Sequence, residues 1–303
     1  MSGGGYFKES WHSQYLARLI EISVAKQMGA KVVLIGQTMG PFYTQKARQE
    51  IGHLLNTCDY LSVRDETTRE HLQRLGVRKP VYVNTDVAIV VSDVFPKKEK
   101  QEKLIVNFMP ANYVAYSGVH TKRIKNKLLR KIKNKLSLKR LLYIKFCRDV
   151  ARLLIERYNA EIHFVPSTNW SWDIKFVNRV AATLPSKAYK ISQDLDVRSL
   201  CEELSKGNLV ISTKMHPLIV SASYLVPGIA VSYDYKIDGF MKRIGCSFAC
   251  LNIDKLTPGS AEKALKIYEE TVSNPDFVST IRESKRQVEN MMLQIRDVCS
   301  GVM

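Results

Sequence analysis

The sequence has few cysteines, and none of them has a metal-binding or redox spacing. The six are scattered over 303 residues without a CxxC pair. Cys246 and Cys250 are four positions apart, but no second pair of cysteine or histidine residues accompanies them, which argues against a zinc site. Scattered cysteines are typical of reduced thiols in a cytoplasmic protein. We therefore expect neither a disulfide-stabilised secreted domain nor a bound metal.

The sequence also lacks a segment typical of a signal peptide or a membrane span. Met1 is followed by glycines and charged residues rather than by an apolar stretch. The longest uncharged run begins at Pro217 and ends before Asp234, and Pro227 and Gly228 interrupt it. This run predicts a short buried helix, a turn and a buried strand rather than a bilayer span.

An apolar strand is missing before the glycines at positions 3 to 5. A glycine run of this kind usually follows a strand and lets the backbone approach a ligand or another loop. Two interpretations stay open. Either the first domain lacks a strand that should precede the glycines, or the glycines form an unstructured tail. The first interpretation is favoured.

Acidic residues are scarce relative to basic ones. The chain has 46 lysines and arginines against 29 aspartates and glutamates, a formal net charge of +17. An excess of this size attracts phosphate-rich partners such as nucleic acid, anionic membranes or small anions. Because the sequence contains no recognised nucleic-acid-binding motif, nucleic acid is not expected as a partner.

Short apolar runs alternate with segments of helical periodicity, which predicts an α/β fold with parallel sheets. Strands are predicted at 31–35, 60–63, 81–83, 88–91, 104–109, 161–165, 209–212 and 229–232. Helices are predicted at 11–28, 44–56, 66–75, 172–184, 196–206, 217–225, 260–273 and 276–299. The charged stretch KKEKQEK after Pro96 suggests a linker. We expect two Rossmann-like domains facing a cleft, the first over 1–97 and the second over 98–275, followed by a C-terminal helix over 276–303.

The residues that follow the predicted strands are the candidates for a functional site, because ligands bind beyond the carboxyl ends of parallel strands. The segment STKMHP is the most informative of these. Pro217 suits the first turn of a helix, whose free N–H groups favour an anion. Lys214 and His216 lie on the approach to that helix, and a cation beside an imidazole suits phosphate binding with proton transfer. The alternative is a structural histidine and a solvated lysine.

Other strand ends supply further candidates. Arg64 follows one strand, and Asp65 can cap the next helix, which would leave Arg64 facing the cleft unless the two form a surface pair. Asp86 and Asp234 are candidate bases or hydroxyl acceptors, although each could simply cap a helix or turn. The remaining candidates for substrate binding are Gly36, Gln37, Gly40, Tyr233 and Lys236.

Taken together, these segments carry a resemblance. GQTMGPF, SVRDETTREHLQRLGV, TDVA and SKGNLVISTKMHPLIVSASYLVPGIAVSYDYKIDGFMKRIG occur in this order and spacing, and with SGGGY they cover roughly residues 2 to 245. This combination resembles the polysaccharide pyruvyl transferase family. The resemblance implies two Rossmann-like domains similar to the GT-B glycosyltransferase arrangement, with the acceptor on the side of the first domain and the donor on that of the second.

The resemblance also implies an activity. Members of the family transfer a pyruvyl group from phosphoenolpyruvate to sugar hydroxyls of cell-surface glycans or exopolysaccharides, usually forming a ketal. No cofactor is expected for this chain. By this resemblance His216, Asp86 and Asp234 are the candidate catalytic residues. Arg64, Lys214 and Lys236 would hold the anionic donor, and the acceptor would be a glycan or a lipid-linked oligosaccharide.

Two departures from the family pattern keep other functions open. The family usually carries βα units before the glycines, and it usually has arginine where this chain has Lys214. Lysine keeps the charge but loses the two-pronged grip on carboxylate or phosphate. The alternatives are a GT-B type glycosyltransferase that uses a nucleotide sugar and a catalytically inactive binding homologue.

One basic segment predicts a membrane contact. Residues 121–148 contain no acidic residue, and their leucines and isoleucines recur at nearly helical spacing between lysines and arginines. We expect a basic helical insertion over 119–148 in the second domain. It either packs its apolar stripe on that domain or lies on an anionic membrane. The expected location is therefore cytoplasmic, peripheral at the inner face of the membrane.

Overall fold

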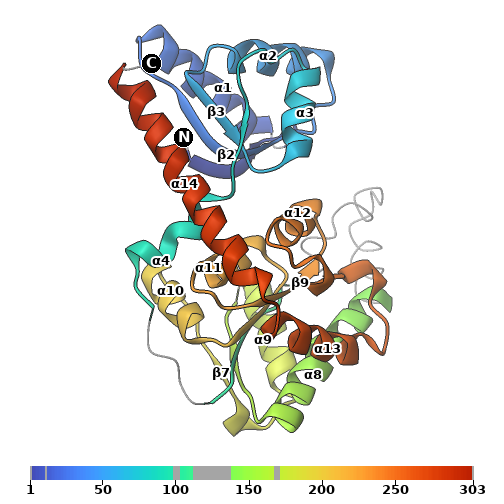
Figure 1. Cartoon of the computed structure of the whole chain (residues 1–303). Helices are drawn as coiled ribbons and strands as arrows, with labels where there is room; N and C mark the ends of the chain where they lie inside the picture. Colours follow the sequence, from blue (N-terminus) through green and yellow to red (C-terminus); the bar gives the residue numbers. More distant parts are fainter. Residues whose placement is uncertain (1, 11, 98–102, 112–137, 167–170, 302–303) are drawn as a thin grey trace. The chain divides into compact units, whose positions relative to one another are not determined.

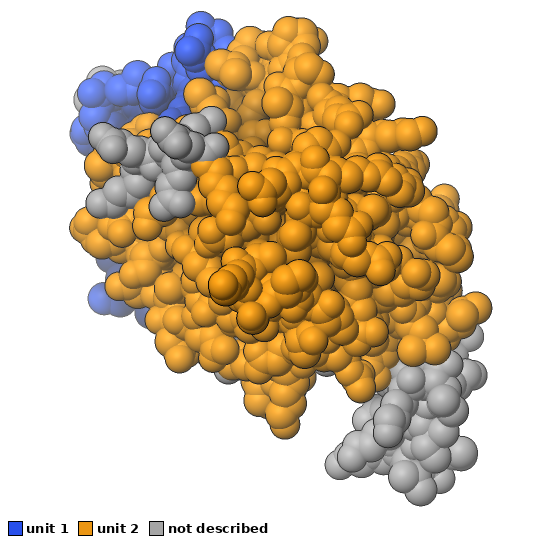
Figure 2. Space-filling model, turned by 90° about the horizontal axis from the view of Figure 1, so that it is seen from below, with its two compact units in different colours: residues 1–90, 282–303 blue, residues 91–281 orange. Residues whose placement is uncertain are grey.

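The computed structural model contains two compact units, which are described separately here (Figures 1 and 2). The first unit comprises residues 1–90 and 282–303, and the second comprises 91–281. The structure describes residues 2–10, 12–97, 103–111, 138–166 and 171–301. The boundary expected after residue 97 adjoins residues 98–102, which lie outside these ranges.

The first unit is built on a four-stranded parallel sheet. Its strands follow the order β1-β2-β3-β4 and are β1 (Ser2–Phe7), β2 (Val33–Met39), β3 (Tyr60–Val63) and β4 (Tyr82–Val83). The connecting helices are α1 (His12–Gln27), α2 (Gln45–Leu55) and α3 (Glu66–Arg74). Thr44 and Asp65 cap α2 and α3 by accepting hydrogen bonds from Ala47 N and Thr68 N, so each helix starts where its capping residue stands. The result is a Rossmann-like unit.

The glycines at positions 3 to 5 do not form a loop after a missing strand, as the sequence suggested. They belong to β1, which pairs in parallel with β2, with Ser2 opposite Ile35 and Gly4 opposite Gln37. The prediction failed because glycine has a low intrinsic strand propensity, and here pairing with β2 overrides that preference.

Apolar side chains from the helices and the sheet form the core of the first unit. Phe7, Leu34, Ile51, Leu55 and Leu72 are fully buried there. The long helix α14 (Asp276–Ser300) adds a second source of core residues from the other end of the chain. In this unit its buried apolar residues are Val288, Met291, Ile295 and Val298.

The segment after β4 differs from the sequence prediction. Residues 88–91 were expected to form a strand, but they fall in the 3₁₀ helix η1 (Val87–Val90) and at the start of α4 (Val91–Val94). The carboxylate of Asp86 accepts a hydrogen bond from Ala88 N at 3.0 Å, which stabilises a turn at this point. The apolar run alone could not distinguish a short helix from a strand.

The second unit contains a six-stranded parallel sheet in the order β10-β9-β8-β5-β6-β7. Its strands are β5 (Ile105–Met109), β6 (Glu161–Phe164), β7 (Tyr189–Ile191), β8 (Leu209–Ser212), β9 (Gly228–Ser232) and β10 (Cys250–Asn252). Its helices are α8 (Leu138–Tyr158), α9 (Ser171–Ala181), α10 (Val197–Lys206), α11 (Met215–Ser223), α12 (Tyr235–Arg243) and α13 (Ser260–Val272). Short 3₁₀ turns are η2 (Ser186–Ala188), η3 (Ser247–Ala249) and η4 (Ile253–Lys255).

The strand order of the second unit identifies where a ligand is expected. From β5 the chain adds β6 and β7 on one side, and then returns to add β8, β9 and β10 on the other. The order therefore reverses between β5 and β8. In open α/β sheets the crevice at the carboxyl ends of such a strand pair is the usual ligand site.

Several elements of the second unit were not predicted from the sequence. The edge strands β7 and β10 have three residues each, too few for a recognisable pattern. Helix α12 was not among the predicted helices. Helix α11 begins at Met215 rather than at Pro217, so His216 lies in its first turn instead of on the approach.

The basic segment is described only in part. Residues 121–137 of the predicted amphipathic helix lie outside the described residues, and α8 covers 138–148. Among the helices of the described ranges, none is both long enough and apolar enough to cross a bilayer. The six cysteines are free thiols.

Candidate functional site

The predicted site residues divide between the two units. In the first unit, Arg64 and Asp86 form an ion pair, with 2.9 Å between Arg64 Nη1 and Asp86 Oδ2. Both side chains are nearly buried, at 10% and 6% exposure. The Nε of Arg64 also donates a hydrogen bond to the carbonyl oxygen of Gly36 at 2.6 Å. Arg64, Asp86 and Gly36 therefore come together at the carboxyl edge of the first sheet, and the Arg64–Asp65 surface pair does not form.

Gly36 is needed for the local backbone path. Its φ of +57° is strained for residues with a Cβ, and the pairing of β2 with β3 shifts register between Leu34 and Gln37. The Gly36 N–H donates to Ser62 Oγ at 2.9 Å, and Arg64 N–H donates to the Gln37 carbonyl at 3.2 Å. The side chain of Gln37 is buried at 1% exposure. Through these contacts the backbone of Gly36 and Gln37 lies directly against Arg64 of the Arg64–Asp86 pair.

Gly40 has a packing reason for its identity. Its φ is +81°, and a Cβ there would lie 3.1 Å from Nε2 of His71. The ring of His71 stacks on Phe42, with 5.8 Å between centroids and an interplanar angle of 8°. Burial, with the neighbouring charges of Arg74 and Arg48, lowers the pKa of His71. Gly40 thus leaves room for an aromatic stack.

In the second unit, Lys214 and His216 line a cavity of about 370 Å³. We call it the α11 cavity. The other lining residues come from the ends of β5 and β6, from the loop after β7, and from α10 and α11: Met109, Val165, Pro166, Ser192, Asp194, Leu195, Leu200, Pro217 and Val220. The cavity therefore lies at the carboxyl edge of the sheet and includes the ends of β5 and β8, where the strand order reverses.

Lys214 is the N-cap residue of α11. Its N–H donates to Ser212 Oγ at 2.9 Å, and the Ser212 hydroxyl donates to the Lys214 carbonyl at 3.0 Å. The side chain is partly buried, and this burial lowers its pKa, while the negative charge of Asp173 acts in the opposite direction. His216 is exposed. A half-buried cation and an accessible imidazole thus stand together at a helix N-terminus, which suits an anionic ligand.

The predicted site residues that follow β9 are not part of the lining of the α11 cavity. Asp234 caps α12, because its carboxylate accepts a hydrogen bond from Lys236 N at 3.1 Å. Burial, with the charges of Asp234 and Asp173, raises the pKa of Tyr233 to about 12. Neither these two residues nor Lys236 is among those that line the α11 cavity.

Two residues that line the α11 cavity, and Asp173 at the same edge of the sheet, were missed from the sequence. Ser192 and Asp194 line it and follow β7, a strand too short to be predicted. Asp173 lies in the first turn of α9 and is fully buried. Within the described ranges, the structure brings together no group of three or more histidine, cysteine, aspartate or glutamate side chains that could hold a metal.

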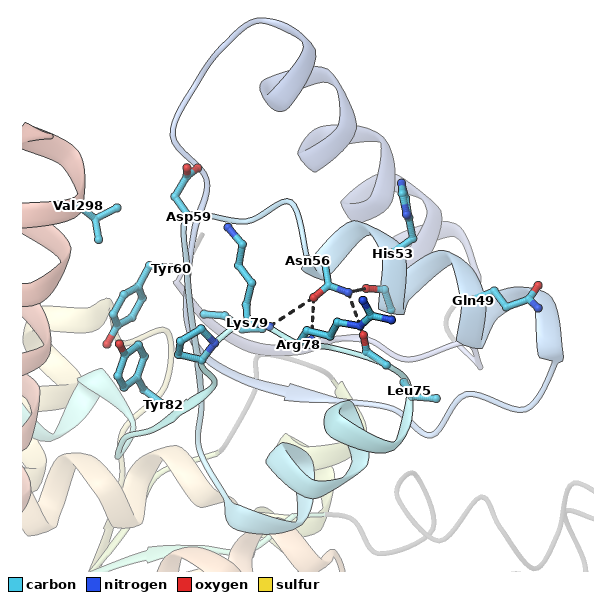
Figure 3. A pocket seen from close by; sticks show the side chains of 14 residues that line it. Gln49, His53, Asn56, Asp59, Tyr60, Leu75, Arg78, Lys79, Tyr82 and Val298 are labelled. Carbon is cyan, nitrogen blue, oxygen red and sulfur yellow. Dashed lines mark hydrogen bonds between the residues drawn. The ribbon is translucent and has the colours of Figure 1, made fainter. Parts of the chain in front are cut away.

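A larger cavity, of about 960 Å³, lies in the first unit at the opposite edge of its sheet (Figure 3). Its lining includes Tyr60 and Tyr82 at the starts of β3 and β4, and Asn56 and Leu75 at the ends of α2 and α3. The Asn56 amide donates to the carbonyls of Gly52 and Gly76 and accepts from Arg78 N. The Asn56 side chain therefore links the last turn of α2 to the residues that follow α3. The cavity lies away from the carboxyl edge of the sheet.

Comparison with known proteins supports the fold. The chain is similar to a putative UDP-N-acetylglucosamine 2-epimerase from Listeria monocytogenes, with a TM-score of 0.55, 11% identity and coverage of 89% of this chain and 65% of the other. It is also similar to a UDP-GlcNAc 2-epimerase from Methanocaldococcus jannaschii, with a TM-score of 0.51, 14% identity and coverage of 93% and 82%. At these identities the likeness shows the fold alone, and it confirms the predicted α/β class with two Rossmann-like domains.

Comparison of sequences shows the family. The amylovoran biosynthesis protein AmsJ from Erwinia amylovora is 22% identical over 265 residues, which make up 85% of this chain and 62% of that protein. The family model for polysaccharide pyruvyl transferases matches residues 1–235. This match includes every residue proposed from the sequence except Lys236. The chain belongs to the polysaccharide pyruvyl transferase family.

Proposed function

We propose that the chain is a phosphoenolpyruvate-dependent pyruvyl transferase that modifies sugar hydroxyls of a cell-surface glycan or exopolysaccharide. Family membership supports action on a polysaccharide, and the relative AmsJ is named for the biosynthesis of amylovoran. The observation that carries the donor assignment is the position of Lys214 and His216 in the α11 cavity.

The α11 cavity suits a small anion with two charged ends. Phosphoenolpyruvate carries a carboxylate and a phosphate, so its site needs cations and backbone donors. Lys214 supplies a cation, and the first turn of α11 supplies the N–H groups of Met215 and His216. Lys236 does not line the cavity, and in the first unit Arg64 is tied to Asp86. Lys214 is therefore the principal anion-binding side chain of this proposal.

His216 is the proposed general acid. It would protonate the methylene carbon of phosphoenolpyruvate, leaving an oxocarbenium-like centre at C2. A sugar hydroxyl then attacks C2 and loses its proton, and the C2–O bond to phosphate breaks. A second hydroxyl of the sugar adds to C2 and loses its proton, which closes the ketal and leaves inorganic phosphate. The exposed imidazole of His216 is accessible to a substrate at the first of these steps.

The first unit is the proposed acceptor side. Asp86 of the first unit and Asp234 of the second unit are the proposed groups that orient or deprotonate the sugar hydroxyls. Each already accepts one backbone hydrogen bond. In the first unit Gly36, Gln37 and Gly40 would bring the backbone close to the glycan. Tyr233, kept neutral by a pKa raised to about 12 through burial, would donate rather than accept a hydrogen bond.

The decisive experiment offers the purified chain phosphoenolpyruvate and candidate glycans, and measures phosphate release and product mass. We expect phosphate release that depends on the glycan, and a product heavier than the glycan by the mass of a pyruvyl ketal. Parallel reactions with nucleotide sugars test the glycosyltransferase alternative. Transfer from a nucleotide sugar alone would overturn the donor assignment. Binding of phosphoenolpyruvate in calorimetry without turnover would indicate the inactive binding homologue.

The basic segment is proposed to hold the enzyme at an anionic membrane, where lipid-linked acceptors are found. In the described part, the N-terminal end of α8 exposes Leu138 at 70% and Leu141 at 53%, close to Lys139 and Lys145. Each basic residue near the surface contributes about 1 kcal/mol to binding anionic lipid. Flotation should therefore favour anionic over neutral vesicles, weaken in high salt, and weaken when alternate lysines of 121–148 become glutamine. Equal binding to both vesicle types would leave the segment as ordinary packing.

A further inference from the structure

Asp173 is a buried carboxylate that neither the sequence nor the family comparison assigns. It lies in the first turn of α9, and its side chain is fully buried, at 0% exposure. Burying a charged group is costly unless a partner compensates it. Asp173 therefore depends on a compensating partner, and its position in the fold points to Lys214.

Three chain segments bring Asp173 to the same edge as the donor residues. Helix α9 follows β6, Lys214 follows β8, and Tyr233 follows β9. In the sheet β9, β8, β5 and β6 are consecutive neighbours and run parallel, so all three residues emerge at the carboxyl edge. Burial lowers the pKa of Lys214, and the charge of Asp173 acts in the opposite direction. The same carboxylate, after burial and Asp234, adds to the raised pKa of Tyr233.

Lysine and arginine differ in how much they depend on such a carboxylate. A guanidinium keeps its charge in almost any protein environment, whereas a desolvated lysine can lose its proton. A neutral amine at the N-cap of α11 would no longer attract an anion. A counter-ion behind Lys214 is therefore needed because this position is a lysine.

We propose that Asp173 is the positioning residue of the donor site, the counter-ion that keeps Lys214 protonated and directed at the α11 cavity. The identity of the donor in this inference rests on the proposed function. The pairing of Asp173 with Lys214 does not depend on that function. Other titratable groups lie in the same region: His216 on α11, Asp194 in the loop after β7, Tyr233 after β9, and Tyr143 on α8, whose ring stacks on Phe176 of α9. Because the pKa of Tyr233 is about 12, it stays neutral through the pH range tested.

The first experiment measures how readily Lys214 is acetylated at different pH values, without any substrate. The chain is labelled with trace acetic anhydride between pH 7 and 10, and the modification of Lys214 is quantified by peptide mass spectrometry. In Asp173→Asn, the titration of Lys214 should move to lower pH, and its labelling at pH 8 should rise about threefold or more. The control is Asp149→Asn, which removes a carboxylate that pairs with Lys145 on α8. An unchanged Lys214 profile in Asp173→Asn would overturn the proposal.

The second experiment measures phosphoenolpyruvate binding by calorimetry at pH 8 in a double-mutant cycle. Asp173→Asn should weaken binding about tenfold in the lysine chain, but by less than about twofold in Lys214→Arg. Equal weakening in both backgrounds would mean that Asp173 has only a structural role and would overturn the proposal. If the unmodified chain binds no phosphoenolpyruvate, the proposed function fails while the labelling experiment still decides the role of Asp173.

A third variant tests the pair if Asp173→Asn does not fold. Lys214→Met leaves the charge of Asp173 buried without its cation. The stability lost in this variant should therefore be greater at pH 8 than at pH 5, because protonation relieves the buried charge. Lys214→Arg is the matched control and should keep its melting temperature at both pH values. A pH-independent loss in Lys214→Met would contradict the pairing.

Discussion

The two units use charge in different ways at equivalent edges of their sheets. In the first unit, Arg64 is held by Asp86 and by the Gly36 carbonyl, and both charged side chains are nearly buried. In the second unit, Lys214 and His216 line an open cavity, and His216 is exposed. A nearly buried ion pair mainly fixes structure, whereas charged groups that line a cavity can also contact a ligand. The comparison predicts a loss of stability when Asp86 is removed, in addition to its proposed catalytic role, and a loss of activity with little loss of stability when His216 is removed.

The largest effect is expected at His216. His216→Ala should reduce pyruvyl transfer by about 10²–10⁴-fold if the imidazole is the general acid, with little change in melting temperature because the side chain is exposed. The measurement is phosphate release with phosphoenolpyruvate and an accepted glycan. His53→Ala is the matched control, because His53 is also exposed but lines the cavity of the first unit. Turnover near the unmodified level in His216→Ala would remove this residue from the mechanism.

The next effect concerns stability in the first unit. Asp86→Ala should lower the free energy of unfolding by about 3–5 kcal/mol, because it leaves the nearly buried Arg64 without its ion-pair partner. The measurement is urea unfolding at neutral pH. Glu66→Ala removes the exposed partner of Arg69 in the same unit and should cost less than about 1 kcal/mol. Equal losses in the two variants would show that the Arg64–Asp86 pair is not structurally important.

A buried cluster of titratable side chains in the second unit should contribute to stability, as the Arg64–Asp86 pair does in the first unit. His163, at 1% exposure, lies 2.6 Å from Glu203 and 2.9 Å from Glu161, and Lys190 lies 3.2 Å from Glu203. Burial alone would raise the pKa of Glu203, but the hydrogen bond and charge of His163, with Lys190, outweigh it and lower this pKa to about 2.

Because the pKa of Glu203 is lower in the folded state, its contribution is present above the unfolded value and is lost as the solution becomes acidic. The shift from 4.5 to about 2 corresponds to about 3 kcal/mol, lost as the pH falls from about 4.5 towards 2. Urea unfolding from pH 7 to 3 should show about 2 kcal/mol of this loss, and Glu203→Gln should flatten the curve. Glu262→Gln, at the exposed pair with Arg157, should leave the curve unchanged. A curve in Glu203→Gln as steep as that of the unmodified chain would contradict the assignment.

The smallest effect is expected for Lys214→Arg. Arginine keeps the positive charge and adds a planar fork that grips carboxylate or phosphate with two hydrogen bonds. The dissociation constant for phosphoenolpyruvate, measured by calorimetry, should stay within about threefold or improve. Loss of binding would mean that the α11 cavity is built specifically around lysine, and the donor assignment would weaken.

Most elements of the fold were predicted where the residues of the element themselves carry the signal for a strand or a helix. Strand β3 was predicted with its observed bounds, because four apolar-rich residues precede the capping signal of Asp65. Strand β1 was missed because its glycines join the sheet only through pairing with β2. Residues 88–91 were assigned to a strand because their apolar run has no helical start signal other than Asp86.

The site residues also divide into those that the local sequence reveals and those that depend on the arrangement of the strands. Lys214 and His216 could be found because they come between a clear strand and a proline, a local pattern. Asp173 could not, because an aspartate in the first turn of a helix is common, and only the order of β6, β8 and β9 in the sheet brings it to Lys214's edge. Residues that depend on strand order rather than on neighbours in sequence are those that a single sequence does not reveal.

Helix α14 has a consequence for how the molecule is made. Its residues up to 281 belong to the second unit and those from 282 onward to the first. In the first unit, Tyr60 donates a hydrogen bond to Gln294 at 3.0 Å, and Met291 is buried beside Ser62. A ribosome synthesises residues 2–90 well before residues 282–301, yet the first unit cannot complete its core until both segments are present. The second unit can therefore finish folding during translation before the first, and two segments far apart in the sequence form a single folding unit.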